Sequence, residues 1–363
     1  MDIDLLGITA PTAPMAPEVA LARIVHLMDR SLAPSTKVRA FRRAAEVVSE
    51  AGADEIAERS TRGTLKELPG IGVSTAAVVT DAVEGRVPAR LAGLEASTVI
   101  GITDEGAVIR AALRGDCHSH STWSDGGASI EAMARTAMAL GHEYLVLTDH
   151  SPRLTVAHGL DRTRLLAQID GVTRLNADLA PFRVLTGIEV DILDDGTLDQ
   201  DEDLLAQLDV VVASAHSKLR MESDAMTRRL VLAVANPHVD ILGHCTGRNL
   251  KPRHGSKPGE PDVARPPSAF DAEIVFAACA RFDTAVEINC RPERQDPPDD
   301  LLTLALEWDC KVAIDTDAHA TGQLEWQSSG CDKAARHEVG VDRIVNSWSA
   351  DELTEWADSH PAR

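Results

Sequence analysis

Three features are missing from this sequence of 363 residues, and each absence excludes a class of protein. The six cysteines include no C-x-x-C pair and are too sparse for a disulfide scaffold, so a reduced, cytoplasmic compartment is expected. No run of 18 apolar residues occurs, and the first residues are acidic and proline-containing, so we expect neither a signal peptide nor a membrane anchor. Basic residues are also in the minority. The formal net charge of −21 argues against a protein that coats nucleic acid through its overall charge, although a local basic patch could still bind it.

The first part of the chain has the pattern of a small helical domain. Residues 1–16 are rich in proline, alanine and threonine, which predicts a flexible arm. From 17 to 96 apolar residues recur at three-to-four spacing, which predicts helices, and residues 97–113 are expected to form a linker. Residues 15–96 contain 11 basic and 11 acidic side chains, so nearly all of the excess acid lies elsewhere. Local binding of phosphate by this domain is therefore permitted.

A glycine-containing turn separates two helical stretches of this domain, at Leu68-Pro69-Gly70-Ile71-Gly72. Glycine permits a sharp turn, and free amides at the start of the next helix favour an anion. The segment resembles a helix-hairpin-helix, a motif that binds nucleic-acid backbone phosphates without regard to sequence. The usual basic residue after the hairpin is absent, but a preceding helix carries a basic face. The candidate DNA contacts are Gly70, Gly72, Arg39, Arg42 and Arg43. A tight turn without a ligand remains the alternative.

From about residue 114 short apolar runs alternate with helical patterns, which predicts a β/α scheme with buried parallel strands. Strands are expected at 143–150, 182–193, 208–217, 239–247, 284–290, 310–319 and 342–348. Helices are expected at 129–141, 161–178, 223–235, 268–281 and 299–308. The stretch 251–268, rich in proline and glycine, predicts a long surface loop. We expect this α/β domain to span 114–350, followed by a C-terminal helix or tail at 351–363.

Histidines and acidic residues gather at the ends of the expected strands. His118 and His120 have the spacing of an extended strand, so both imidazoles leave the same face. The C-terminal ends of parallel strands in a barrel meet at one mouth, so the candidates should converge there. They are His118, His120, Asp125, His150, Glu189, His216, His244, Asp317 and His319. One histidine at a strand end is usually an ordinary core residue, but six of the thirteen in such places are poorly explained by coincidence.

This set of side chains suggests a cluster of metal ions. Imidazole and carboxylate without thiolate suit zinc, manganese or iron. Nine ligands exceed the needs of one ion, so two or three divalent ions are expected. Clustered ions can polarise a phosphoryl oxygen, lower the pKa of a water and stabilise a leaving oxygen. The sequence therefore predicts a metal-dependent hydrolase of phosphate esters.

Basic residues near the expected mouth are candidates for holding substrate phosphate. They are Lys218, Arg220, Arg248, Arg291 and Arg294, and the alternative for each is a solvated loop charge. Arg248 and Arg291 directly follow strand ends, where a planar guanidinium could clamp a phosphate. His158 lies in the loop after His150. It is a candidate for binding substrate or protonating a leaving group, and an ordinary loop histidine is an equal alternative.

The ordered motifs of residues 114–348 resemble those of the PHP (polymerase and histidinol phosphatase) superfamily. They are LRGDCHSHSTWSDG, LTDHS, GIEVDIL, VVASAHS, VDILGHCTGR, VEIN and DTDAH. They are most similar to the PHP module of bacterial family X DNA polymerases. The resemblance implies a distorted (β/α)7 barrel with up to three metals on the nine candidates, with Glu189 bridging two of them. It also implies catalytic roles for Glu189 and Asp317.

The N-terminal region resembles the helix-hairpin-helix domain of the same polymerases, yet only about twenty residues separate it from the barrel. The polymerase palm and thumb have no room there, so polymerase activity is not expected. Three functions remain. A phosphoesterase of DNA ends (3′-5′ exonuclease or 3′-phosphatase) is favoured by the hairpin, and a small-molecule phosphatase of the histidinol-phosphatase type is favoured by the acidic charge. A DNA-binding repair accessory with an idle barrel is disfavoured by the complete ligand set. We expect a phosphate-ester substrate, with DNA as a candidate partner and no membrane.

Overall fold

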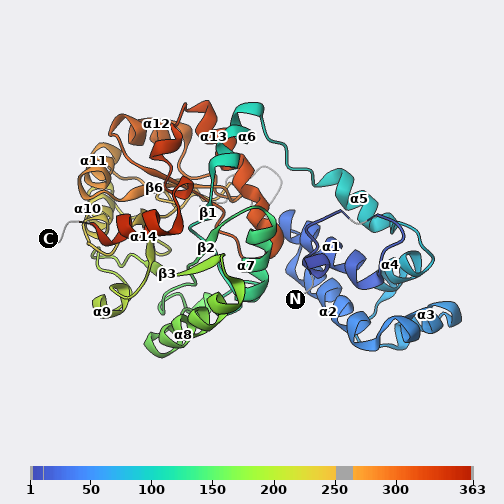
Figure 1. Ribbon diagram of the computed structural model, residues 1–363. Coiled ribbons are helices and arrows are strands. Elements are labelled where there is room, and N and C mark those ends of the chain that lie inside the picture. The colour runs from blue at the N-terminus through green and yellow to red at the C-terminus, as the bar shows by residue number, and fades with distance from the viewer. Residues whose placement is uncertain (1–2, 11, 251–264, 361–363) are drawn as a thin grey trace. The chain divides into compact units, whose positions relative to one another are not determined.

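The computed structural model describes residues 3–10, 12–250 and 265–360, and these divide into two compact units (Figure 1). One unit contains residues 1–100 with 320–325, and the other contains 101–319 with 326–363. Within the described ranges, none of the helices combines the length and the apolar character needed to cross a bilayer.

The first unit consists of helices, as predicted from the sequence. Its elements are η1 (Ile3–Leu6), α1 (Pro17–Arg30), α2 (Ser35–Ala51), α3 (Ala53–Arg62), η2 (Leu65–Glu67), α4 (Val73–Val83) and α5 (Ala89–Ser97). Helix α1 lies at its centre and packs against α2, α4 and α5, and its residues Leu21, Ile24 and Leu27 are fully buried. Part of the segment predicted to be a flexible arm is held in place, because Leu6 is buried and the Arg23 guanidinium donates to the Gly7 carbonyl oxygen at 2.9 Å.

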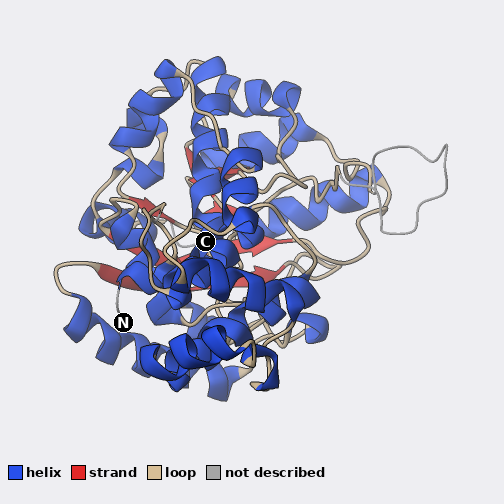
Figure 2. Cartoon of the chain, turned by 90° about the vertical axis from the view of Figure 1, so that its right-hand side faces the viewer, coloured by secondary structure: helices blue, strands red, loops and turns tan. Residues whose placement is uncertain are grey.

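The second unit is a seven-stranded parallel sheet, curved into a nearly closed barrel with helices outside (Figure 2). Its strands follow chain order: β1 (Gly115–Asp116), β2 (Tyr144–Leu147), β3 (Arg183–Asp191), β4 (Val210–Ser214), β5 (Ile241–Leu242), β6 (Ala285–Asn289) and β7 (Val312–Asp315). The predicted distorted (β/α)7 barrel is confirmed.

Helices connect successive strands of this barrel. The predicted helices correspond to α7 (Ile130–Ala139), α8 (Arg162–Leu179), α10 (Ser223–Val234), α11 (Ala272–Phe282) and α12 (Asp299–Glu307). The further helical elements are α6 (Asp104–Ala112), η3 (Thr155–Ala157), α9 (Glu202–Leu205), α13 (Gln327–Arg336) and α14 (Ala350–Asp358). The turn η4 (Thr321–Trp326) falls almost entirely in the first unit. Helix α6 lies within the segment expected to be a linker, and its first turn is capped by Thr103, whose hydroxyl accepts from the Gly106 amide.

Strand alternation decides which side chains enter the barrel. In β4, Val210 and Val212 belong to the inner apolar cluster, whereas Val211 and Ala213 pack with the helices outside. The same period of two places Glu189 on the inner face of β3 with Leu185. The inner face is therefore apolar at the beginning of a strand and acidic toward its end. Leu353 and Trp356 of α14 pack against the apolar part.

The barrel closes between β1 and β7 by isolated contacts instead of a continuous ladder. Ser119 and Ala318 form a parallel bridge, and the His120 amide donates to the Ala318 carbonyl oxygen at 2.8 Å. Below this bridge the Asp315 carboxylate accepts from the Cys117 amide at 2.8 Å. A side chain thus completes the wall where β1, at two residues, is too short to pair.

The prediction of a strand at 342–348 was wrong. This segment forms two short turns, η5 (Val341–Arg343) and η6 (Val345–Ser347), and only Ile344 bridges to β7. The physical reason is Asn346, whose amide replaces a ladder: Oδ1 accepts from the Ile314 amide at 2.6 Å and Nδ2 donates to Asp315 at 2.8 Å. Of the surface loop predicted at 251–268, residues 251–264 lie outside the described part of the chain.

Candidate metal centre

Glu189 lies in the middle of a group of histidines inside the barrel, and its side chain is 1% exposed. Its two carboxylate oxygens face different partners. Oε2 lies 2.9 Å from His150 Nδ1, 3.4 Å from His118 Nε2 and 3.5 Å from His120 Nε2. Oε1 lies 2.8 Å from His244 Nε2 and 3.2 Å from His216 Nε2. One carboxylate is therefore shared by two sets of imidazoles.

The other candidate ligands join the same cluster from the loops after β1 and β7. Asp125 Oδ1 lies 3.3 Å from His319 Nε2 and 3.5 Å from His150 Nε2. Asp317 Oδ1 lies 3.5 Å from His120 Nε2. Each of the nine side chains predicted from the sequence is thus within 3.5 Å of another member of the set.

The cluster has the chemistry of a cation site. Three overlapping groups have ligand atoms within 4.8 Å of one another: His120, Asp125, His150 and His319; His118, His120 and Glu189; and His150, Glu189 and His216. Within the described residues, several buried ring nitrogens here have no hydrogen-bond partner, including His118 Nε2, both ring nitrogens of His120, and His216 Nε2. Burying polar atoms without partners is costly, so bound cations would satisfy this set. The residues present fit the predicted metal ions.

Protonation of these groups depends strongly on burial and on their neighbours. Burial alone would raise the pKa of Glu189, but His216, His118 and His150 hold it well below its usual range. Burial lowers the pKa of His120 well below its usual value, and the neighbouring His319 and His150 add to that shift. Burial also acts against a charged His216, yet Glu189 and Asp191 raise its pKa to about 9. An ionised carboxylate beside a neutral His120 is the state that can ligate a cation.

A buried aspartate organises the loop that carries His118, His120 and Asp125. Asp149 accepts from the Ser121 amide at 2.8 Å, from the Ser121 hydroxyl at 2.6 Å and from Gln168 Nε2 of α8 at 2.7 Å. Ser124 donates to the same carboxylate through its amide at 3.2 Å. These bonds explain the small polar residues between the ligands, because serine fits tightly and supplies donors.

Two of the predicted substrate-binding cations reach the cluster. Arg294 Nε lies 2.9 Å from Asp317 Oδ2, and Arg291 Nη1 lies 3.7 Å from Asp317 Oδ1. Arg248 Nε instead donates to the Arg294 carbonyl oxygen at 2.8 Å, so it supports the loop that presents those two arginines. Lys218 is exposed and forms an ion pair with Asp194.

Two other predicted residues lie at the surface. Arg220 is exposed. His158 is also exposed, in a left-handed backbone conformation with φ of 55°. In the described part of the chain, the His158 ring makes no hydrogen bond or ion pair with the nine clustered residues.

Sequence reasoning missed the residues that support the ligands from behind. Glu287 lies 2.6 Å from His118 Nδ1, and Asp191 lies 3.3 Å from His216 Nδ1. Both occupy strands whose inner face turns from apolar to acidic. Strand alternation could have found Glu287, which follows the inward-facing Ala285 by two residues.

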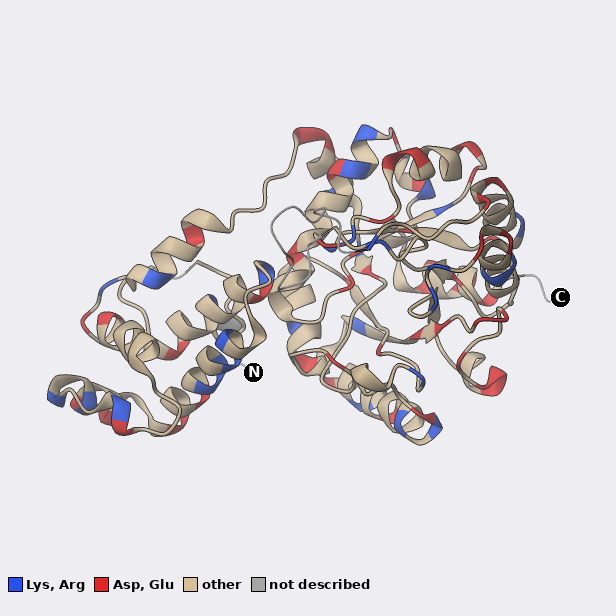
Figure 3. Cartoon of the chain, turned by 180° about the vertical axis from the view of Figure 1, so that it is seen from behind, with Lys and Arg blue, Asp and Glu red and all other residues tan. Residues whose placement is uncertain are grey.

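The predicted DNA contacts lie in the helical unit, where both basic and acidic residues occur on the helices (Figure 3). Gly70 has φ of 101°, and a Cβ there would lie 3.0 Å from Arg43 Cγ. The turn therefore requires glycine and places it against Arg43. Arg43 is exposed and pairs with Glu46 at 3.0 Å.

The other predicted DNA contacts differ in whether their polar groups already bind another residue of the helical unit. Arg42 pairs with the buried Asp29 at 3.1 Å, and burial raises the pKa of Asp29 to about 6 although Arg42 opposes the shift. Arg39 is exposed. The Gly72 amide donates to the Thr75 hydroxyl at 2.9 Å, which occupies one donor at the start of α4.

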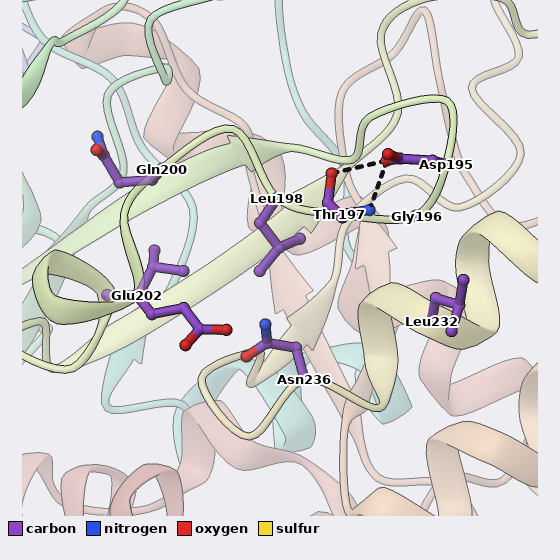
Figure 4. Close-up of a pocket in the computed structure, with 9 residues that line it drawn as sticks. Asp195, Gly196, Thr197, Leu198, Gln200, Glu202, Leu232 and Asn236 are labelled. Carbon is purple, nitrogen blue, oxygen red and sulfur yellow. Dashed lines mark hydrogen bonds between the residues drawn. The ribbon is translucent and has the colours of Figure 1, made fainter. Parts of the chain in front are cut away.

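A separate hollow of about 200 Å³ lies beside the loop after β3 (Figure 4). Asp195 closes that loop by accepting from the Thr197 amide at 3.0 Å and from its hydroxyl at 2.7 Å. None of the nine clustered residues lines this hollow.

Comparison with known proteins gives a consistent result. The PHP domain model matches residues 116–256. A probable phosphatase of Thermoanaerobacter sp. (strain X514) is 31% identical over 222 residues, which are 57% of this chain and 79% of the phosphatase. The chain belongs to the PHP family. The DNA polymerase/3′-5′ exonuclease PolX of Bacillus subtilis (strain 168) is 38% identical over 237 residues, 65% of this chain and 40% of that protein.

A further match is a solved structure of histidinol phosphate phosphatase from Lactococcus lactis, in complex with zinc, L-histidinol and phosphate. It has a TM-score of 0.41 and 18% identity, and the match covers 61% of this chain and 94% of that one.

The PHP family membership, the barrel and the buried ligand cluster agree on the chemistry. This chain is a PHP-family hydrolase, a metal-dependent phosphoesterase with several buried groups able to hold metal.

Proposed function

We propose that this protein hydrolyses phosphate esters at DNA ends, as a 3′-5′ exonuclease or a 3′-phosphatase. The observation that carries the hydrolytic part is Glu189, whose two oxygens face two separate sets of histidines inside the barrel. A shared carboxylate is the arrangement that holds two cations close together.

The nine clustered residues would hold two or three divalent ions of zinc, manganese or iron. Bound there, such ions supply a water of lowered pKa and positive charge for the leaving oxygen. Glu189 and Asp317 are the carboxylates that we assign to catalysis. Most of the nine residues are buried, which strengthens their electrostatic interactions, whereas Asp125 is exposed.

Arg291 and Arg294 are the residues that we assign to substrate phosphate. Arg294 is kept in place by Asp317 at 2.9 Å, and the Arg291 guanidinium lies 3.0 Å from His319 Nδ1. Two guanidinium groups at the edge of the cluster can orient an anionic ester toward it. In this proposal Arg248 acts through the loop, and His158 would contact only the outer part of a long substrate.

Two features favour DNA as the substrate. One is the helical unit, and the other is the similarity between most of this chain and one relative. PolX carries the name of a 3′-5′ exonuclease, and 65% of this chain matches it. The exposed Arg39 and Arg43 lie one turn apart on α2, and Arg43 touches the turn at Gly70. We propose that this face contacts the DNA backbone, and that Gly70 and Gly72 let the strand approach closely.

A small phosphorylated metabolite is the second candidate substrate. The net charge of −21 repels a polyanion, and the probable phosphatase matches this chain over 79% of its own length. A phosphomonoesterase of the histidinol-phosphatase type would need the barrel alone.

One experiment separates these functions. Metal-analysed protein is incubated with 5′- and 3′-labelled DNA and, in parallel, with a panel of phosphate monoesters. Shortening of DNA from the 3′ end or loss of a 3′ phosphate supports the proposal, and turnover of monoesters alone moves the assignment to a small-molecule phosphatase. A protein that holds its ions and hydrolyses neither would be a DNA-binding accessory with an idle barrel.

A further inference from the structure

Glu287 is a fully buried acid that does not belong to the nine clustered residues. It lies in the middle of β6, between the apolar Val286 and Ile288, and is 0% exposed. Strand alternation turns it into the barrel with Ala285, whereas Val286 packs outside with the helices. A charged side chain at this depth requires partners of compensating character.

The two carboxylate oxygens of Glu287 reach two of the clustered histidines. Oε1 lies 2.6 Å from Nδ1 of His118. Oε2 accepts from the backbone amide of His244 and, at 3.1 Å, from the Asn289 side chain. Asn289 Nδ2 also lies 3.3 Å from Asp317 Oδ2. Glu287 therefore supports the His118 ring, the His244 backbone and, through Asn289, the Asp317 carboxylate.

The contact with His118 orients that imidazole. A carboxylate oxygen accepts from a ring N–H, so Nδ1 donates to Glu287. Nε2 then lies on the opposite side of the ring, where it can face a cation. Among the described residues that atom is buried without a hydrogen-bond partner, and it lies 3.4 Å from Glu189 Oε2. His118 is thus presented with its ligating nitrogen toward the shared carboxylate.

We propose that Glu287 is a positioning residue for the metal centre. It orients His118 and the backbone at His244, and it would strengthen the binding of a cation held by those histidines. This inference rests on the proposed metal-dependent function. A carboxylate that accepts from the free ring N–H of a ligating histidine restrains the ring and makes the other nitrogen a better ligand.

The test measures ion binding in the full chain with Glu287→Gln. The substitution preserves size but removes the charge that holds the Nδ1 proton. Zn²⁺ is titrated into chelator-stripped protein in competition with a chromophoric chelator, and the bound ions are counted by elemental analysis. We expect one of the bound ions to be held about 10- to 100-fold more weakly than in the wild type.

The matched control is Asp240→Asn. Asp240 is a buried acid immediately before β5 that also pairs with a histidine, His360 Nε2 at 3.0 Å, and accepts from the Val211 amide at 2.6 Å. It is not among the residues of the cluster. We expect Asp240→Asn to lower stability while its affinity for Zn²⁺ stays at the wild-type value.

Each outcome is decisive. Wild-type affinity for every ion in folded Glu287→Gln overturns the inference, as does an equal loss in Asp240→Asn. If Glu287→Gln does not fold, Glu287→Asp serves instead, since it keeps the charge but shortens the reach to His118; unchanged affinity there also overturns the inference. If the wild-type protein binds no Zn²⁺, the proposed function itself is refuted. That result differs from one in which the wild type binds Zn²⁺ and only the inference about Glu287 fails.

Discussion

Glu189 and His244 meet inside the barrel, with 2.8 Å between Oε1 and Nε2. The other oxygen of the same carboxylate lies 2.9 Å from His150 Nδ1, on the opposite side of the cluster. A side chain from one strand thus connects histidines that follow two other strands. Its loss should therefore affect the whole centre and not a single ligand.

Glu189→Gln tests this relationship. The variant keeps the shape of the side chain and removes the negative charge that the cations need. We expect hydrolysis of the preferred phosphate ester to fall by on the order of 100-fold or more, with an unchanged far-ultraviolet circular dichroism spectrum. Wild-type turnover by the folded variant would show that Glu189 is not a ligand.

Metal content is the second prediction. The nine candidate ligands, which include the shared carboxylate of Glu189, should hold two or three ions per chain, measurable by elemental analysis after gentle purification. Ions that bind only the folded state stabilise it by mass action, so a chelator should lower the unfolding midpoint of the barrel and added Zn²⁺ or Mn²⁺ should restore it. An active, well-folded sample without bound ions would contradict this expectation.

The third prediction concerns the loop held by Asp149. Ser121→Ala removes a buried donor 2.6 Å from that carboxylate. We expect a loss of about 1–3 kcal/mol in the free energy of unfolding, because the buried charge loses one of its hydrogen bonds. Thr173→Ala is the control. It removes an exposed hydroxyl that bonds within α8, and the expected change is within about 0.5 kcal/mol. Equal effects of the two substitutions would show that Asp149 does not organise the loop.

The fourth prediction is acid sensitivity caused by His142. Burial lowers the pKa of His142 to about 3, and Arg110, whose guanidinium lies 3.4 Å away, adds to the shift. The unfolded chain takes up this proton near pH 6.5, so the contribution of neutral His142 to stability is present above pH 6.5 and is lost as pH falls toward 3.

Denaturant unfolding of the chelated protein at pH 6.5 and pH 5 measures this effect. Between these values the wild type should lose about 1.6 kcal/mol more than His142→Asn, because the unfolded imidazole goes from half to almost fully protonated and each pKa unit corresponds to about 1.4 kcal/mol. Parallel losses in the two proteins would assign the acid sensitivity to other groups.

The fifth prediction addresses DNA. Arg43→Glu should weaken the binding of single- and double-stranded DNA at low salt and reduce the slope of the logarithm of affinity against the logarithm of salt concentration. Hydrolysis of a small phosphate monoester should not change. Arg86→Glu is the control, because Arg86 follows the opposite end of α4 from Gly72. Equal DNA binding by both variants and the wild type would remove the α2 face from the proposal.

Much of the barrel and the cluster was predictable from local sequence. The strand runs are continuous apolar segments, and the ligands follow them directly, so position in the sequence implies position at the mouth. His118 and His120 are recognisable because a period of two points both rings the same way.

The features that the sequence did not predict correctly depend on single side chains and on contacts between residues far apart in the sequence. Asn346 has the sequence context of a strand, but its amide binds β7 and replaces the ladder. Arg248 has the context of a phosphate clamp, yet it donates to the Arg294 carbonyl oxygen. The local sequence marks Glu287 only as an acid that strand alternation places on the inner face with Ala285. Its role becomes visible only when β6 is placed opposite His118, which lies 169 residues away in the sequence.

The closure of the barrel has a consequence for how its ions exchange. The contact between Ser119 and Ala318 is flanked on one side by His118 and His120 and on the other by Asp317 and His319. The contact that closes the wall therefore runs through the metal centre, where an isolated bridge takes the place of a ladder. Local opening of the contact between Ser119 and Ala318 would separate the two pairs of ligands. Bound ions would in turn hold this contact closed. The His120 amide, which bonds across this contact at 2.8 Å, should accordingly exchange its hydrogen faster when the ions are removed.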